Sequence, residues 1–130
     1  MTPALTLRIV TPRRVAWQGE AVEVRLPGFL GQFGVLPDHE RLLSVARPGR
    51  VHIVTAQGDA VFVVGTGFAE VGSDHLTLLT DHCEPAEGLD RDLAEKELHQ
   101  AEVELFHAQH GTAAWDEIER RMELARARIG

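Results

Sequence analysis

The sequence predicts an antiparallel β-sandwich or barrel followed by two antiparallel helices, and three observations favour this fold class. First, the N-terminal part contains many short runs rich in Val, Leu and Ile, separated by turn residues. Second, the composition changes after Cys83, where Glu84-Pro85 interrupts the strand pattern. Third, two later segments carry apolar residues at helical spacing. We therefore assign residues 1–84 to a β domain and residues 85–130 to a helical hairpin.

Six runs have the length and composition of strands, and close turns between them favour antiparallel pairing. Turn residues include Pro48-Gly49, Gln57-Gly58-Asp59 and Ser73-Asp74. Because aromatic residues make up only 5% of the chain, we expect an aliphatic core. The predicted strands are Leu5–Val10, Ala21–Leu26, Arg50–Val54, Ala60–Val64, Phe68–Val71 and Leu76–Thr80.

The segment Pro27–His39 (PGFLGQFGVLPDH) is the most unusual part of the sequence. It carries Gly28, Gly31 and Gly34 at a spacing of three, and such glycines allow backbone conformations that other residues avoid. The segment is either a long ordered turn or a loop that binds a partner. Large apolar residues in an exposed loop usually mark a partner site, so we expect Leu30 and Phe33 to be partly exposed.

Two helices are predicted in the C-terminal domain. Asp90 is the expected N-cap of the first helix and Thr112 that of the second, while Gly111 is expected in the C′ role after the first. Both helices have narrow apolar stripes, which is typical of an antiparallel hairpin that buries little area. The stripes are Ala94, Leu98, Ala101, Leu105 and Ala108, then Trp115, Ile118, Met122, Ala125 and Ile129.

The charge and the cysteine content narrow the range of possible functions and cellular locations. The formal net charge of −7 argues against nucleic-acid binding, which needs an excess of Lys and Arg. The acidic excess lies in residues 84–130, yet the last eleven residues contain four arginines and one Glu. The single cysteine, Cys83, fits a reducing compartment. With no signal peptide and no apolar run of about 18 residues, we expect a soluble, cytoplasmic protein that touches a membrane only through protein partners.

The sequence contains no recognisable catalytic constellation. Lys96 is the only lysine, and no phosphate-binding GxxxxGK[ST] loop is present. Asp38-His39-Glu40 offers adjacent ligands, but neighbouring residues on a strand point to opposite faces. We therefore predict no catalytic and no metal site, and an interaction subunit. Two alternatives stay open: a β-sandwich ligand-binding module with a helical oligomerisation tail, and a small metal-dependent enzyme that uses His39.

An ordered set of segments resembles the epsilon subunit of F-type ATP synthases, which is called delta in mitochondria. The resemblance covers nearly the whole chain, and its specificity lies in the order of the segments rather than in any single motif. The segments are Leu7–Val15, Val24–Gly28, Gly31–His39, Leu42-Leu43, Pro48-Gly49, Gly65–Val71 (GTGFAEV) and Leu76–Asp81.

The resemblance implies a sandwich of about ten strands and a non-catalytic role in the central stalk, or rotor, that couples ion translocation to ATP synthesis. The implied partners are the gamma subunit, the c-ring and, through the helices, the catalytic alpha and beta subunits. The implied place is the cytoplasmic face of the bacterial plasma membrane, reached through the c-ring. The implied contacts with gamma and the c-ring are Gly28, Leu30, Gly31, Gln32, Phe33 and His39.

Two further features of the resemblance concern regulation. Some relatives bind ATP through an [IL]-D-x-x-R-A motif, which here is degenerate, because Leu93 replaces the arginine in the series Leu89, Asp90, Leu93, Ala94. We therefore expect no cofactor. In many relatives the helical pair inhibits ATP hydrolysis, and we expect the basic end of the second helix to act through Arg120, Arg121, Arg126 and Arg128.

Overall fold

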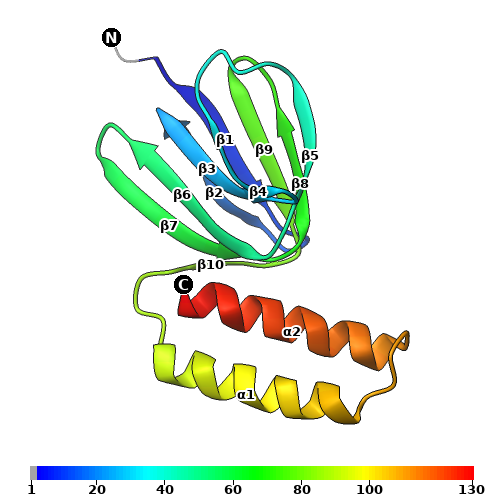
Figure 1. Ribbon diagram of the computed structural model, residues 1–130. Coiled ribbons are helices and arrows are strands. Elements are labelled where there is room, and N and C mark those ends of the chain that lie inside the picture. Colours follow the sequence, from blue (N-terminus) through cyan, green and yellow to red (C-terminus); the bar gives the residue numbers. More distant parts are fainter. Residues whose placement is uncertain (1–2) are drawn as a thin grey trace.

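The computed structural model describes residues 3–130 and consists of a curved β domain and a helical hairpin packed against its lower end (Figure 1). This confirms the fold class predicted from the sequence. The helices are α1 (Arg91–His107) and α2 (Ala113–Ile129). The strands are β1 (Leu5–Val10), β2 (Val15–Ala21), β3 (Glu23–Gly28), β4 (Gly31–Val35), β5 (Leu42–Ala46), β6 (Gly49–Thr55), β7 (Gly58–Val64), β8 (Gly67–Val71), β9 (His75–Thr80) and β10 (Cys83–Pro85).

The strands form one hydrogen-bonded sheet that folds back on itself. Its order is β10-β7-β6-β3-β5-β8-β9-β1-β2, and β4 pairs with β3 beside this path. The pairs are antiparallel except β1 with β9, which are parallel. These two strands are distant in sequence, so no tight turn dictates their relative direction.

The core lies between the two halves of the folded sheet and is aliphatic, as predicted. Side chains alternate along β1, where Leu5, Leu7 and Ile9 are buried and the residues between them face outward. Trp17, Phe33 and Phe62 pack at the margin of this core. Its other large buried members are Val24, Leu26, Val35, Val51, Ile53, Val64, Leu76 and Leu78.

All six predicted strands are present within a few residues, and four further strands were not predicted from the local pattern. The most informative addition is β4, because it lies inside the segment interpreted as a long turn. Gly28 pairs with Gly31, so Phe29 and Leu30 form the turn of a tight β3–β4 hairpin. The interpretation of the whole segment as a turn is wrong, because pairing with β3 outweighs the low strand propensity of its glycines.

The helix starts follow the predicted caps. Asp90 accepts a hydrogen bond from the backbone N of Leu93 at 3.1 Å, and Thr112 accepts one from Trp115 N at 3.2 Å. The predicted C′ role of Gly111 is wrong, because α1 ends at His107 and Ala108 leaves the helix in an extended conformation. Gly111 instead supplies a positive φ of 84° in the connection between the helices.

The hairpin and the sandwich have separate apolar cores. Ala101, Ile118 and Met122 are buried between the two helices, with Leu98 and Leu105 packed beside them. Figure 1 shows α2 between α1 and the sandwich, with its C-terminal end beneath the sheet. The hairpin therefore meets the sandwich mainly through α2.

Candidate functional surfaces

The β3–β4 turn presents the most exposed apolar side chains of the β domain. Leu30 is 97% exposed and Phe29 is 66% exposed. Two glycines shape this turn: Gly31 has a φ of 125°, which other residues rarely adopt, and a Cβ on Gly28 would lie 2.7 Å from the Phe33 ring. Gly28 and Gly31 therefore shape the turn, while Phe29 and Leu30 form its accessible surface.

The turn lies beside the C-terminal half of α2. The guanidinium of Arg47 is 5.8 Å from the centroid of the Phe29 ring, close enough for a cation–π contact. The same arginine lies 3.7 Å from a carboxylate oxygen of Glu123 on α2. A cleft of about 530 Å³ separates the turn from α2, with Gln32 on one side and Arg126 on the other. Gln32 thus faces the junction of the two domains.

The six residues predicted as partner contacts do not form one cluster. Gly28, Leu30, Gly31 and Gln32 lie at the turn, and the expected exposure of Leu30 is met. Phe33 is partly exposed, as expected, but it also packs against the sandwich core, which limits its availability to a partner.

His39 lies beyond the opposite end of β4, where Asp38 adopts a φ of 64° and its N donates to Ser73 O at 2.7 Å. The Nδ1 of His39 is 2.6 Å from the carbonyl oxygen of Glu40. A partner that contacts both Leu30 and His39 must therefore reach along the length of β4.

A second exposed apolar surface crosses three strands. Val45 on β5 is opposite Phe68 on β8, and Phe68 is opposite Leu79 on β9. These three residues, which we call the outer row, are 42%, 54% and 50% exposed. Leu43, two residues before Val45 on the same face, is also exposed. A contiguous apolar surface of this kind marks a protein interaction site more often than scattered single residues do.

Hollows lie on both sides of the outer row. One, of about 480 Å³, is bordered by Val10, Phe68 and Leu79. Another, of about 530 Å³, is bordered by Leu43, Glu70 and His75. In the second hollow His75 lies 3.9 Å from Glu70 and 3.1 Å from Asp74. The surface therefore combines an apolar centre with a polar margin, which is the usual composition of a protein interface.

Sequence reasoning missed the outer row because β5 was not predicted. Once β5 is aligned with β8 and β9, alternate residues on all three strands share one face. The signal available in the sequence was that this outward-facing set contains Val45, Phe68 and Leu79 rather than polar residues.

The four arginines predicted to regulate activity have different surroundings. Arg120 lies 3.4 Å from Glu117 in the preceding turn, and Arg121 pairs with Glu104 of α1. Arg126 is exposed, and no carboxylate of residues 3–130 lies within ion-pair distance of it. Arg128 instead lies at the junction with the sandwich, where its side chain is 24% exposed. The structure thus places residues that the sequence grouped together in different surroundings.

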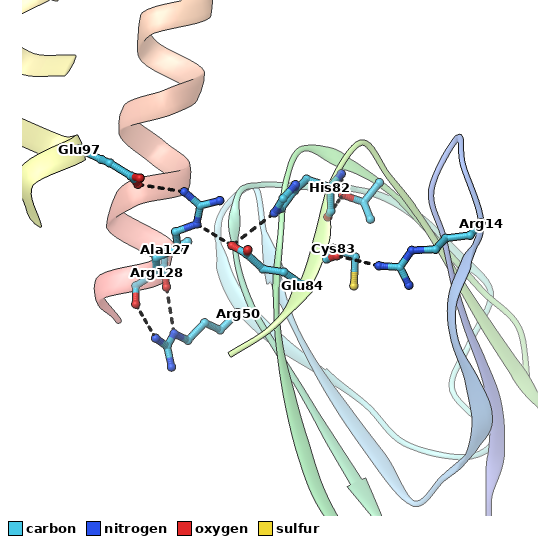
Figure 2. Close-up of polar contacts among 9 residues, drawn as sticks. Arg14, Arg50, His82, Cys83, Glu84, Glu97, Ala127 and Arg128 are labelled. Atoms are coloured by element: carbon cyan, nitrogen blue, oxygen red, sulfur yellow. Dashed lines mark hydrogen bonds and ion pairs between the residues drawn. The ribbon is translucent and has the colours of Figure 1, made fainter. Parts of the chain in front are cut away.

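Figure 2 shows the contacts at this junction. The guanidinium of Arg128 donates to Glu84 Oε1 of β10 at 2.6 Å and to Glu97 Oε2 of α1 at 3.0 Å. Arg50 of β6 donates to the carbonyl oxygens of Ala127 and Arg128, each at 2.9 Å. Arg50 therefore binds the C-terminal carbonyls of α2, which carry the negative end of the helix dipole.

The Glu84 carboxylate is the centre of the junction. Partial burial favours its neutral form, but the hydrogen bond and charge of Arg128, together with His82, outweigh that effect and lower the pKa of Glu84. Conversely, the hydrogen bond to Glu84 raises the pKa of Arg128 despite burial. The Nε2 atom of His82 is 3.3 Å from Glu84 Oε1. Both members of the Glu84–Arg128 pair are thus held in their charged forms.

The residues of the degenerate ATP motif have other contacts. The Asp90 side chain caps the start of α1 by accepting a hydrogen bond from Leu93 N, and Ala94 is buried. Leu93 is exposed, and the neighbouring Arg91 is bound to Glu95 at 3.1 Å.

Comparison with known proteins decides the family. Residues 4–86 match the family model described as the ATP synthase, Delta/Epsilon chain, beta-sandwich domain. The chain is 36% identical over 129 residues to the ATP synthase epsilon chain of Synechococcus sp. (strain RCC307), covering 97% of this chain and 95% of the relative. It is a member of the ATP synthase epsilon chain family.

Other epsilon chains agree with this assignment. That of a Nitratiruptor species is 34% identical over 122 residues, covering 93% of this chain and 95% of the relative. The fold matches a chain of the Euglena gracilis mitochondrial ATP synthase, OSCP/F1/c-ring, with a TM-score of 0.83, 20% identity and coverage of 95% and 78%. It also matches a chain of the Tetrahymena thermophila mitochondrial ATP synthase central stalk/c-ring, with a TM-score of 0.64, 14% identity and coverage of 100% and 98%.

As a member of the epsilon chain family, this chain is a subunit of an ATP synthase. Within residues 3–130 neither helix has the length and apolar character needed to cross a bilayer. The outer row and the β3–β4 turn are exposed apolar surfaces of the sandwich, and surfaces of this kind often mark sites of protein interaction.

Proposed function

We propose that this epsilon chain is a non-catalytic rotor subunit that joins the gamma subunit to the c-ring in the central stalk of an F-type ATP synthase. In this role it transmits rotation between the ion-translocating ring and the catalytic subunits, and it performs no chemistry itself. It lies at the cytoplasmic face of the bacterial plasma membrane and reaches the membrane through the c-ring. The observation that carries the proposal is a sandwich with two separate exposed apolar surfaces, in a chain that belongs to this family.

The outer row is the proposed gamma-binding surface. Val45, Phe68 and Leu79 are presented by three paired strands, so they form a broad and rigid surface. An apolar centre with Glu70 and His75 at its margin suits a large protein partner better than a small molecule. Burial of a partly exposed aromatic residue such as Phe68 is a common source of binding energy.

The β3–β4 turn is the proposed c-ring contact. It projects Phe29 and Leu30 from a narrow hairpin, which suits insertion between the loops of a ring better than contact with a broad face. Leu30 and Gln32 carry no charge, so this contact relies more on apolar burial and less on charge. Two separate surfaces allow the sandwich to bind both partners at once.

The hairpin is proposed to inhibit ATP hydrolysis by contacting the alpha and beta subunits. Arg126 is exposed without an ion pair to residues 3–130, and Arg120 pairs only with Glu117 of its own helix, whereas Arg121 and Arg128 bridge to Glu104 of α1 and Glu84 of β10. We therefore assign the charge-based contact with the catalytic subunits to Arg120 and Arg126. Such attraction between exposed charges weakens with salt, with a Debye length of about 10 Å at 0.1 M.

The rotor proposal is tested by comparing Phe68→Ser with Phe106→Ser. Phe106 on α1 is 87% exposed and lies outside the outer row, so it controls for the loss of a surface phenylalanine. Phe68→Ser is expected to weaken binding of purified gamma subunit by about tenfold or more, as loss of a buried aromatic anchor does. Phe106→Ser is expected to leave gamma binding unchanged. Equal affinity of both variants would contradict the assignment of the outer row.

A further inference from the structure

The junction between hairpin and sandwich lies at one end of α2 and combines polar contacts with a small apolar patch. Val63 of β7, which pairs with Arg50 and Glu84, and Ala127 of α2 are buried although neither belongs to the apolar cluster of its own region. The apolar core of the sandwich and that of the hairpin are separate clusters. The hydrogen bonds and ion pairs across the junction come from Arg50, Glu84 and Arg128, with a longer ion pair between Arg47 and Glu123. Neither apolar core needs to be disrupted for the two domains to separate.

Arg128 is shared between the two domains. Through Glu97 it is tied to α1 within the hairpin, and through Glu84 it is tied to β10 of the sandwich. Glu97 therefore positions the guanidinium toward β10 when the hairpin is packed against the sandwich. If the hairpin leaves, Arg128 keeps Glu97 and Glu84 keeps His82, so neither charge is left without a neighbouring opposite or polar group.

Arg50 adds a second contact of the same kind. Its guanidinium donates to two carbonyl oxygens in the last turn of α2, which have no partner within the helix. In the separated state these carbonyls accept hydrogen bonds from water instead. The contact between Arg50 and α2 is thus fully reversible, and it is strongest when the helix end is correctly placed against β6.

We propose that Arg128, Glu84 and Arg50 form an ionic lock that holds the hairpin against the sandwich and sets how often it is released. This deepens the inhibitory role proposed above, because only a released hairpin can reach the catalytic subunits. It gives the arginines of α2 opposite effects. Arg128 restrains the hairpin, whereas Arg120 and Arg126 act after release.

The lock is tested in the full isolated chain, so its outcome does not depend on inhibition of any complex. Ala127 is buried at the edge of the cleft between α2 and the sandwich, so the thiol of an Ala127→Cys variant is shielded in the packed state and is labelled faster when α2 leaves the sandwich. Cys83→Ser removes the native thiol. Met122→Cys serves as a second probe, because Met122 is buried between the helices and stays protected if the hairpin separates as a unit. The labelling rate under native conditions reports the open population even when that population is small.

Arg128→Gln is expected to raise the labelling rate at Ala127→Cys by about tenfold, in the range of a lost charge-assisted hydrogen bond. Arg126→Gln is the matched control, since Arg126 lies two residues away on α2 without an ion pair to residues 3–130, and its rate should stay within about twofold of the parent. Labelling at Met122→Cys should not change. Added salt should accelerate labelling in the parent but not in Arg128→Gln.

Glu84→Gln provides an independent variant on the sandwich side. If the lock is correct, Glu84→Gln also raises labelling at Ala127→Cys, and adding Arg128→Gln to it has little further effect. Equal labelling in Arg128→Gln and Arg126→Gln would overturn the proposal. So would a parallel rise at Met122→Cys, because that result means that Arg128 stabilises the hairpin itself rather than its contact with the sandwich.

Discussion

The sandwich and the hairpin of this epsilon chain are stabilised in different ways. The sandwich has a continuous aliphatic core in which residues such as Leu7, Ile53 and Leu78 are fully buried. The hairpin has a narrow seam in which Ala101, Ile118 and Met122 are buried. It joins the sandwich through hydrogen bonds and ion pairs around a small apolar patch rather than through a continuous core. From this comparison we expect the sandwich to act as a rigid platform for partners and the hairpin to be able to change its position.

The largest expected difference between the two regions lies in their cores. Leu7→Ala should lower the free energy of unfolding of the sandwich by about 2–5 kcal/mol, the usual cost of a cavity in a well-packed core. Met122→Ala should reduce the helical signal while the sandwich still unfolds at its original denaturant concentration. Far-ultraviolet circular dichroism and tryptophan fluorescence measured together check this. Loss of sandwich stability in Met122→Ala would show that the two regions form one cooperative unit.

A smaller difference is expected between two residues of the β3–β4 hairpin. Phe33 packs against the core, so Phe33→Ala should cost about 1–3 kcal/mol of sandwich stability, below the range for a fully buried phenylalanine. Leu30 is almost fully exposed, so Leu30→Ala should change stability by less than about 0.5 kcal/mol. Chemical denaturation measures both. If Leu30→Ala were the more destabilising change, the turn would be part of the core rather than a partner surface.

The helix caps give an effect confined to the hairpin. Asp90→Ala and Thr112→Ala each remove the acceptor for a backbone N–H at a helix start and should cost about 1 kcal/mol. Hydrogen exchange should show faster exchange in the helix that loses its cap and unchanged protection of β1 and β9. Faster exchange throughout the sheet would contradict the independence of the two regions.

The smallest expected effect concerns pH. The pKa of Glu84 is lowered in the packed state because Arg128 and His82 outweigh the effect of burial. A lowered pKa in the packed state means that the stabilisation is present above the ordinary Glu value of 4.5 and is lost as the pH falls through the lowered value. Labelling of Ala127→Cys, normalised to a free thiol at each pH, should therefore rise as the pH falls below 4.5. Glu84→Gln should abolish this rise, and an unchanged pH dependence in that variant would assign it to another group.

The two regions also differ in how far the sequence predicted them. The helix starts at Asp90 and Thr112 followed from local cap chemistry, and the strand Leu5–Val10 followed from strict alternation. In contrast, β4 and β5 are defined by their neighbours: β4 contains two glycines, and β5 is recognised only when it pairs with β8. Their prediction would have required the register of strands far apart in the sequence.

The candidate surfaces depend on the same long-range register. Leu30 was found from its place in a glycine-rich turn, which is a local feature. The outer row was missed because Val45, Phe68 and Leu79 come together only through two ladders. The separate role of Arg128 was missed for a similar reason, since Glu84 lies 44 positions away in the sequence and Glu97 lies 31.

The central claim is that the sandwich is an independent platform and the hairpin a releasable part. The most direct test is to express residues 1–86, which contain all ten strands, and to measure thermal unfolding and gamma binding beside the full chain. We predict one cooperative unfolding transition and an affinity for gamma within about threefold of the full chain, since the hairpin contributes none of the outer row. An unfolded fragment, or a folded fragment that no longer binds gamma, would contradict the claim.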